Sequence, residues 1–150
     1  MTPTRHVLAL AALAAAVAPL GAQTRLLRSP TVSERHVAFA YANNIWIVER
    51  AACGAAGGCS ARRLTSFQGQ TTNPRLSPDG RWVAYQEWRS GTGWDVTALE
   101  RATGRVVRVT NDPANEQEPS WLPDGRGLLF ASDRARGLGY PALYRIEFAP

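Results

Sequence analysis

A stretch of this 150-residue chain occurs twice, displaced by 45 residues and without a gap. Residues 73–85 read NPRLSPDGRWVAY, and residues 118–130 read EPSWLPDGRGLLF. The match extends upstream, where RLT at residues 63–65 corresponds to RVT at residues 108–110. A period of about 20 to 50 residues is typical of folds that stack one small structural unit on the next. The repeat therefore predicts a chain of similar units, each covering the apolar face of its neighbour.

A third and weaker copy precedes these two, at residues 29–39, which read SPTVSERHVAF. It begins with Ser29-Pro30, but it has Ser33-Glu34 where the other copies have Pro-Asp-Gly. Terminal units of repeat arrays are commonly atypical, because they have a neighbour on one side alone. We therefore count this segment as the first of three units.

Each unit contains several short strand signals separated by glycine and proline. In the middle unit, residues 78–80 form a turn, because Pro fixes φ, Asp bonds its own backbone and Gly accepts a positive φ. Residues 82–85 (WVAY) are apolar at every position, which predicts a strand buried on both faces. The four strands expected in this unit are residues 74–77, 82–85, 95–100 and 105–110.

Four strands per unit, at a period near 45 residues, are the architecture of one blade of a β-propeller. The sequence thus predicts an all-β fold, an incomplete β-propeller of about three four-stranded antiparallel blades with the last one incomplete. The expected blades are residues 28–66, 73–111 and 118–150. Closed propellers have roughly four to eight blades. We therefore expect a partial gene product whose uncovered sheet faces associate with the remaining blades or with further copies of the chain.

The two matched turns each contain a carboxylate, which leaves two interpretations for Asp79 and Asp124. They are a pair of catalytic carboxylates, or they are turn residues. Their identical position in the repeat favours the turn. The expected structural turn residues are Pro78, Asp79, Gly80, Pro123, Asp124 and Gly125.

The N-terminus has the plan of a secretory signal peptide. Arg5 and His6 precede an apolar stretch at residues 7–17, and small residues follow up to Ala22. The alternative is an Ala-rich helix of the fold. The apolar stretch is shorter than the roughly 20 residues that a membrane-spanning helix needs. We expect residues 1–22 to be removed and residues 23–150 to be periplasmic or secreted, without a membrane span.

Cys53 and Cys59 lie in the sequence CGAAGGC. This flexible loop can bring the thiols within bonding distance, and export places them in an oxidising compartment. A local disulfide and two free thiols are the alternatives, of which we expect the disulfide. Two ligands at this spacing do not make a structural zinc site.

Catalytic and cofactor motifs are missing from the sequence. After removal of the signal peptide the single imidazole is His36, and no Gly-x-Ser-x-Gly elbow occurs. Neither a His-Glu-x-x-His motif nor an EF-hand loop occurs, and the glycine-containing segment 137–142 precedes a strand pattern where a dinucleotide site needs a helix. We expect no catalytic residue, no metal and no cofactor. For Trp88 and Trp94, which flank a loop, ligand stacking and a core position both stay open.

The charge pattern argues against a nucleic-acid partner. The formal net charge is +5, and the chain has Arg but no Lys. An Arg-driven polyanion binder is one interpretation, but the arginines are scattered from Arg25 to Arg145 without the run of roughly five basic residues that a basic arm has. We retain ordinary surface solvation as the expectation.

The blocks LSPDGRWVAY and WLPDGRGLLFASDR, with RRLT and RVTNDPANEQEP before them, resemble the WD40-like repeats of the TolB-type β-propeller. The same repeat forms the propellers of tricorn-type and prolyl-oligopeptidase-type peptidases. The opening stretch, from SPTVSERHVAFAYANNIWIVER to ARRLTSFQGQTTNPRLSPDG, is most similar to the start of secreted tricorn-like serine peptidases, from which the Cys-containing insertion departs. The resemblance covers about residues 28–148 and implies a fold more specifically than a function.

Two functions are implied by that resemblance. The first is a non-catalytic propeller segment of an exported peptidase, which guides or filters peptide substrates or mediates protein contacts. The second is a TolB-like periplasmic propeller that binds a protein. The partner is a protein or a peptide in both cases. The reading frame beyond Pro150 separates them, because a serine-peptidase domain there favours the first and further blades alone favour the second.

Overall fold

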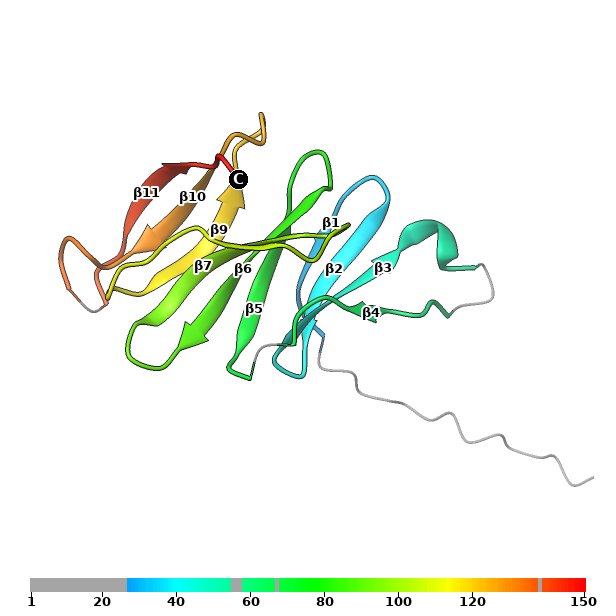
Figure 1. Cartoon of the computed structure of the whole chain (residues 1–150), viewed down its shortest axis with the longest axis horizontal. Coiled ribbons are helices and arrows are strands. Elements are labelled where there is room, and N and C mark those ends of the chain that lie inside the picture. The colour runs from blue at the N-terminus through cyan, green and yellow to red at the C-terminus, as the bar shows by residue number, and fades with distance from the viewer. Residues whose placement is uncertain (1–26, 55–57, 67, 138) are drawn as a thin grey trace, which may run out of the picture.

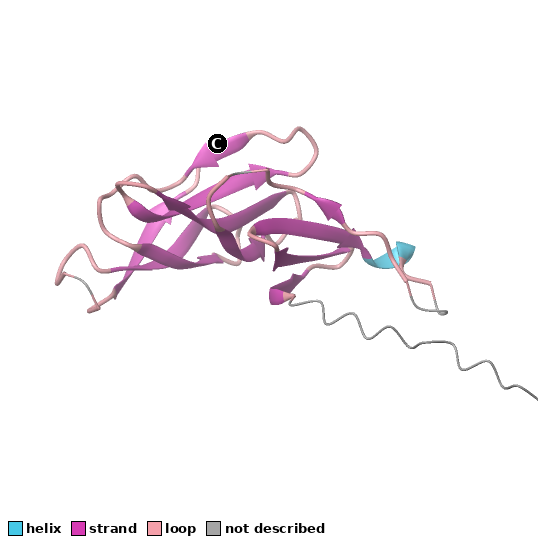
Figure 2. Cartoon of the chain, turned by 90° about the horizontal axis from the view of Figure 1, so that it is seen from below, coloured by secondary structure: helices cyan, strands magenta, loops and turns pink. Residues whose placement is uncertain are grey.

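The computed structural model of the chain describes residues 27–54, 58–66, 68–137 and 139–150. Within these residues, eleven strands form three antiparallel sheets, each made of strands that are consecutive in the sequence (Figure 1). Besides strands and loops, the described residues contain one short 3-10 helix, at Arg50–Ala52 (Figure 2). The predicted signal peptide, residues 1–22, lies outside the described residues.

The strands follow one another across each sheet in simple meander order. The first sheet contains β1 (Arg28–Val32), β2 (His36–Tyr41), β3 (Asn44–Glu49) and β4 (Arg62–Arg63). The second sheet contains β5 (Thr71–Leu76), β6 (Trp82–Arg89), β7 (Gly93–Glu100) and β8 (Val106–Arg108). The third sheet contains β9 (Glu116–Trp121), β10 (Gly127–Ser132) and β11 (Ala142–Glu147).

The all-β prediction with three antiparallel blades, the last incomplete, is confirmed. The strand bounds differ most at the end of β6, which continues to Arg89 and not to the expected Tyr85, and at the start of β5. β5 begins at Thr71, three residues before the expected Pro74, because its backbone pairs with β6 on both sides of a bulge. β4 covers two residues, Arg62–Arg63, since it pairs with β3 over this short length alone.

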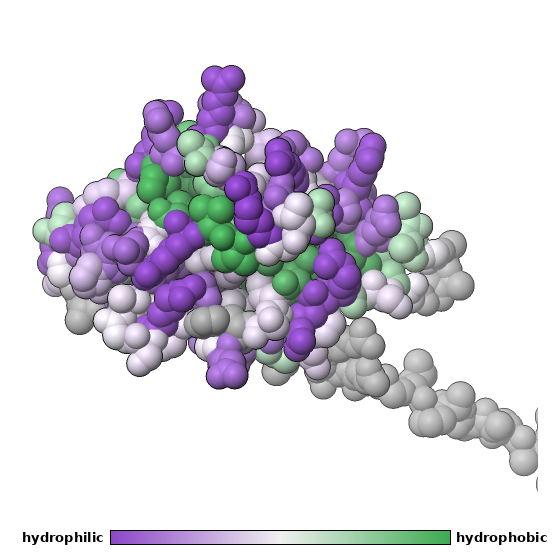
Figure 3. Space-filling view, in the orientation of Figure 1, coloured by the Kyte–Doolittle hydropathy of each residue, from purple (hydrophilic) through white to green (hydrophobic). Residues whose placement is uncertain are grey.

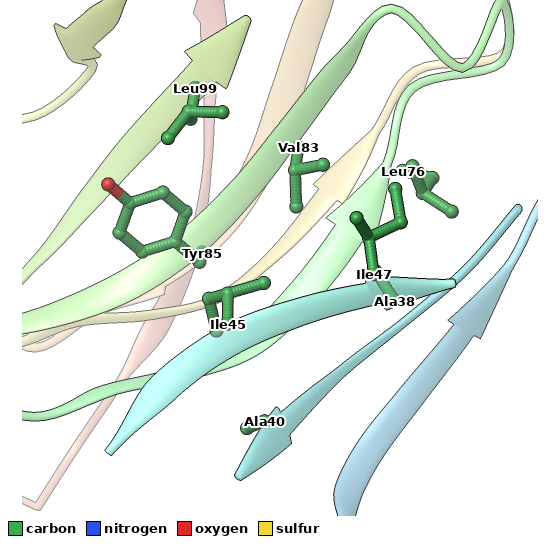
Figure 4. Packing of buried hydrophobic residues seen from close by; sticks show 8 residues of the cluster. All are labelled: Ala38, Ala40, Ile45, Ile47, Leu76, Val83, Tyr85 and Leu99. Carbon is green, nitrogen blue, oxygen red and sulfur yellow. The ribbon is translucent and has the colours of Figure 1, made fainter. Parts of the chain in front are cut away.

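The sheets pack face to face, and the first strand of each later sheet lies against the sheet before it. β5 contacts β1, β2 and β3, and β9 contacts β5, β6 and β7. Figure 4 shows the apolar cluster between the first two sheets, whose buried members are Ala38, Ala40, Ile45, Ile47, Leu76, Val83, Tyr85 and Leu99. The buried members of the cluster between the second and third sheets are Ala84, Val96, Leu128 and Phe130.

The second sheet is buried on both faces, as its apolar run WVAY predicts. Successive side chains of β6 point to opposite faces, so Val83 and Tyr85 join the first cluster while Ala84 joins the second. All three side chains are at most 3% exposed. This sheet therefore holds the two outer sheets together through the hydrophobic effect.

Within the described residues, no other sheet covers the outward apolar face of the first sheet. Val37 and Phe39 of β2 and Trp46 and Val48 of β3 help to line a groove of about 860 Å³. Val37 occupies the strand position of Val83, which is fully buried because the first sheet covers it. Figure 3 shows further apolar surface between projecting polar side chains, mainly over the middle of the molecule. The groove is thus a blade face without its neighbour.

Candidate functional site

The first strand of each sheet (β1, β5 and β9) contains a bulge at the residue that precedes its proline. Ser29, Asn73 and Glu118 have φ angles of 49°, 49° and 53°, all in the left-handed region. The pairing register with the second strand shifts around each of them. A bulge of this kind turns one side chain out of the regular alternation. In each of the three sheets, the bulge therefore redirects one side chain at the equivalent position of the first strand.

The three re-aimed side chains form hydrogen bonds from sheet to sheet. Ser29 Oγ donates to Asn73 Oδ1 over 2.5 Å, and Asn73 Nδ2 donates to Glu118 Oε1 over 2.7 Å. We call Ser29, Asn73 and Glu118 the inner ladder, because they lie on β1, β5 and β9, which contact one another in succession. The inner ladder crosses both interfaces along the edge where the sheets meet.

Gln86 of β6 supports the inner ladder from within the second sheet. Its side-chain oxygen accepts hydrogen bonds from Asn73 Nδ2 and, over 3.2 Å, from the backbone N–H of Glu118. Gln86 is 3% exposed, so these bonds replace contacts with water. The second sheet thereby fixes the direction in which the ladder residues point.

The inner ladder ends in an accessible carboxylate. The side chain of Glu118 is 60% exposed, and its Oε2 lies 3.7 Å from Arg75 Nη2. Oε1 already accepts from Asn73, whereas Oε2 has a distant cation as its neighbour. An ionised carboxylate accepts hydrogen bonds at both oxygens. Glu118 can therefore receive N–H groups of a ligand at this edge.

The first of the two predicted turns, residues 78–80, is closed by its own carboxylate. Asp79 Oδ1 accepts from Ser77 Oγ over 2.5 Å and from the backbone N–H of Arg81 over 2.9 Å. The bond from Ser77, more than any other contact, holds the pKa of Asp79 below its usual value. Gly80 has a φ of 68°, which glycine adopts without steric cost. Asp79 thus lies in a turn.

The second predicted turn, residues 123–125, repeats this geometry. Asp124 Oδ1 accepts from the backbone N–H of Arg126 over 2.9 Å, and Gly125 has a φ of 70°. The two turns are neighbours, since a Cβ at Gly125 would lie 3.9 Å from Pro78 Cδ. Neither turn carboxylate bonds to the inner ladder within the described part of the chain.

The first unit keeps the hydrogen bonds of the turn although it lacks Pro-Asp-Gly. Ser33 N–H donates to His36 O over 2.8 Å, and His36 N–H donates to Ser33 Oγ over 3.1 Å. Ser77 and Trp82 form the same two bonds, each over 2.9 Å. A serine at the start of the turn closes it in both units, over fewer residues in the first.

Cys53 and Cys59 are disulfide-bonded, with Cα atoms 4.5 Å apart. The pair lies in the connection between β3 and β4 and lines one side of the apolar groove. Both cysteines are exposed, and neither contributes to the inner ladder. The disulfide therefore belongs to the edge of the first sheet.

The tryptophans left open by the sequence pack against each other. Trp88 and Trp94 are directly paired across β6 and β7, with ring centroids 5.5 Å apart in an edge-on arrangement. Trp88 remains 45% exposed. Trp82 and Trp121 instead each contact Phe148 edge-on, at 5.0 Å. The structure therefore assigns Trp82 and Trp121 to the apolar packing between sheets, whereas the ring of Trp88 stays at the surface.

The sequence did not predict that two carboxylates are buried. Asp95 and Glu116 are both 0% exposed. Asp95 accepts from Arg108 Nη2 over 2.6 Å, and Glu116 bonds to Arg134 and, over 3.0 Å, to Ser132 Oγ. Buried carboxylates require such partners. Asp95 precedes an apolar strand run, but nothing in one sequence shows that an arginine faces it.

The one described imidazole has no nucleophile against its ring. The hydroxyl of Ser33 bonds to the backbone of His36, whereas His36 Nε2 lies 3.0 Å from Arg101 Nη1. A nucleophile–base pair needs the hydroxyl on the imidazole ring itself. His36 therefore lies in an arginine contact between sheets and does not act as a base toward Ser33.

Comparison with known families decides the relationship. Residues 24–149 match the family described as the tricorn protease N-terminal β-propeller domain. The chain belongs to this family. The match spans all three sheets, so the tricorn propeller assignment rests on the whole described fold.

Relatives of this tricorn-type propeller include peptidases and TolB proteins. An uncharacterized peptidase, YuxL of Bacillus subtilis (strain 168), is 28% identical over 120 residues, which are 80% of this chain and 17% of the relative. The crystal structure of TolB from Acinetobacter baumannii has a TM-score of 0.68 at 26% identity, covering 83% of this chain and 30% of that one. The crystal structure of the tricorn protease has a TM-score of 0.66 at 23% identity, covering 82% and 12%. The chain thus spans less than a third of each.

Within the described residues, no three His, Cys, Asp or Glu side chains are grouped so as to hold a metal ion. No helix of that part of the chain is long and apolar enough to cross a membrane. The bulge that carries each inner-ladder residue recurs on the first strand of each sheet.

Proposed function

We propose that this tricorn-type propeller segment is non-catalytic and binds peptides or proteins, as part of an exported peptidase whose substrates it guides or filters. The inner ladder carries the proposal. It places one polar side chain of each sheet at the edge where the sheets meet and ends in the accessible carboxylate of Glu118. A peptide offers N–H donors that such a carboxylate accepts.

Export is part of the same proposal. The basic start, the short apolar stretch and the small residues up to Ala22 support a signal peptide, and the Cys53–Cys59 disulfide fits an oxidising compartment. The mature chain of residues 23–150 is then periplasmic or secreted. N-terminal sequencing of the protein recovered from outside the cytoplasm tests this, since a chain that still begins at Met1 contradicts it.

The experiment measures binding of a fluorescent random peptide pool to the full chain by anisotropy. Glu118→Gln removes the charge and keeps the shape, so we expect binding weaker by roughly 10-fold or more, the usual value of a hydrogen bond to a charged group. Glu147→Gln is the matched control, because Glu147 is an exposed carboxylate on β11 away from the inner ladder. Equal binding by both variants, or no binding by the unchanged chain, contradicts the proposal.

A TolB-like periplasmic propeller, which binds a folded protein instead of peptides, is the alternative function. The 26% identity to TolB from Acinetobacter baumannii favours it. The reading frame beyond Pro150 distinguishes the two. A serine-peptidase domain encoded there supports the peptidase, and further blades alone support the TolB-like function.

A further inference from the structure

The two junctions between sheets differ at one equivalent position. Arg101 follows β7, the third strand of the second sheet, and Phe148 follows β11, the third strand of the third sheet. Each bonds to the turn of its own sheet: Arg101 N–H donates to Arg81 O over 3.0 Å, and Phe148 N–H donates to Arg126 O over 2.9 Å. The side chain of each such residue then contacts the sheet before it. Phe148 packs against Trp82 with ring centroids 5.0 Å apart.

At the first junction the same place holds a polar contact. Arg101 Nη1 donates to His36 Nε2 over 3.0 Å, and Arg101 Nε donates to Gly80 O. His36 begins β2, as Trp82 begins β6. The junction between the first and second sheets therefore contains a titratable pair where the junction between the second and third sheets contains two aromatic rings.

The hydrogen bond from Arg101 requires a neutral imidazole. A neutral histidine has one ring nitrogen that accepts, whereas the protonated ring has two donors and no acceptor. Protonation of His36 at Nε2 thus removes the acceptor and places a second cation beside the guanidinium. The contact turns from attractive to repulsive with a single proton.

Both cationic and anionic groups surround His36. Arg35 precedes it, Arg62 lies on β4 and Arg101 approaches from the second sheet, while Glu49 is its direct partner on β3. Two further carboxylates, those of Glu34 and Asp79, line the hollow of about 410 Å³ that His36 shares with Arg101. This hollow gives water and protons access to the ring.

We propose that the junction between the first and second sheets is a pH-sensitive contact, in which protonation of His36 displaces Arg101 and loosens the first sheet. The aromatic junction between Trp82 and Phe148 keeps the third sheet in place over the same pH range. One end of the molecule thus responds to acid and the other does not, which is a property beyond the proposed peptide binding.

The direction of the pH effect follows from the His36 environment. Burial first, and then the charge of Arg101, lower the pKa of His36 from its usual value, against the opposing charge of Glu49. A histidine with a lowered folded pKa contributes its full stability above the unfolded pKa of about 6.5. The contribution is lost as pH falls from there through the folded pKa.

The test is amide hydrogen exchange of the full chain at about pH 7.5 and about pH 5.5, corrected for intrinsic rates. His6→Gln is introduced throughout, so that His36 is the only imidazole. We expect exchange in residues 36–41, the β2 strand that begins at His36, to rise several-fold at the lower pH, with no comparable rise in residues 127–132 of β10. In His36→Gln, which keeps an acceptor but does not titrate, exchange in residues 36–41 stays the same at both pH values.

A second measurement does not depend on stability. NMR titration of the His36 ring in the same protein is expected to give a pKa below that of a free histidine, and Arg101→Met raises it. An unshifted pKa, an unchanged pKa in Arg101→Met, or an equal acid response in His36→Gln overturns the proposal. Equal loosening of both junctions overturns it as well.

Discussion

Glycine is required at two equivalent positions, because both Pro-Asp-Gly turns contain a left-handed residue. Gly80 has a φ of 68° and Gly125 a φ of 70°. The space around each is adequate, since the nearest atoms to an added Cβ lie 3.6 Å and 3.9 Å away. The cost of any other residue there is therefore backbone strain and not a clash.

We predict that Gly80→Ala and Gly125→Ala each lower the free energy of unfolding by about 1–2 kcal/mol, the strain of a left-handed residue with a Cβ. Gly54→Ala is the control, because Gly54 has no positive φ and nothing within 4 Å of an added Cβ. Urea denaturation measures all three. A neutral Gly80→Ala shows that the turn relaxes without strain.

The carboxylate of the first turn gives a prediction on pH. The Ser77 hydroxyl is the main cause of the lowered pKa of Asp79, so Ser77→Ala raises that pKa toward its usual value. Because the folded pKa lies below the unfolded one, ionised Asp79 stabilises the fold above its unfolded pKa and loses this contribution as pH falls through the lowered value. Carboxyl NMR titration of both proteins measures the shift, and an unchanged pKa contradicts the assignment.

At the scale of elements, the repeat predicted the sheets but not the bulges. The turn residues and the apolar run WVAY each allow one local structure, so the strands on either side of them were predictable. A residue before proline is instead biased toward extended backbone. Ser29, Asn73 and Glu118 depart from that bias, and they differ chemically. The inner ladder was therefore invisible in one sequence, although the recurring proline after it marks the position.

The inner ladder depends most on its central member. Asn73 bonds to Ser29, Gln86 and Glu118, whereas Ser29 bonds to Asn73. We predict that Asn73→Ala lowers the free energy of unfolding by about 1–3 kcal/mol, the cost of unpaired buried polar groups. Ser29→Ala costs about half a kcal/mol to 1.5 kcal/mol, that of one hydrogen bond. Denaturant titration compares them, and equal losses contradict the central role of Asn73.

At the scale of the whole molecule, the three sheets are unequally covered. The second sheet has neighbours on both faces, whereas the first exposes the groove that Val37, Phe39, Trp46 and Val48 line. Contiguous apolar surface of this kind favours association in water. The folded chain on its own is thus expected to cover this groove with another protein surface.

We predict that the chain sediments as a concentration-dependent associating species, and that Phe39→Gln lowers its apparent mass toward that of the monomer. The polar side chain removes apolar area from the lining of the groove. Val106→Gln is the control, because Val106 is 53% exposed on β8 and outside the groove. A monomeric unchanged chain at all concentrations contradicts the prediction.

The hydrogen bonds of the inner ladder also have a common direction. Ser29 donates a hydrogen bond to Asn73, and Asn73 donates one to Glu118, so both side-chain bonds between the ladder residues run from the first sheet toward the third. A sheet that docks beyond Glu118 must supply a hydrogen there, and one that docks before Ser29 must supply one as well, because the single hydroxyl hydrogen of Ser29 already bonds to Asn73. A neighbouring blade is thus expected to present a hydrogen-bond donor at either end of the inner ladder.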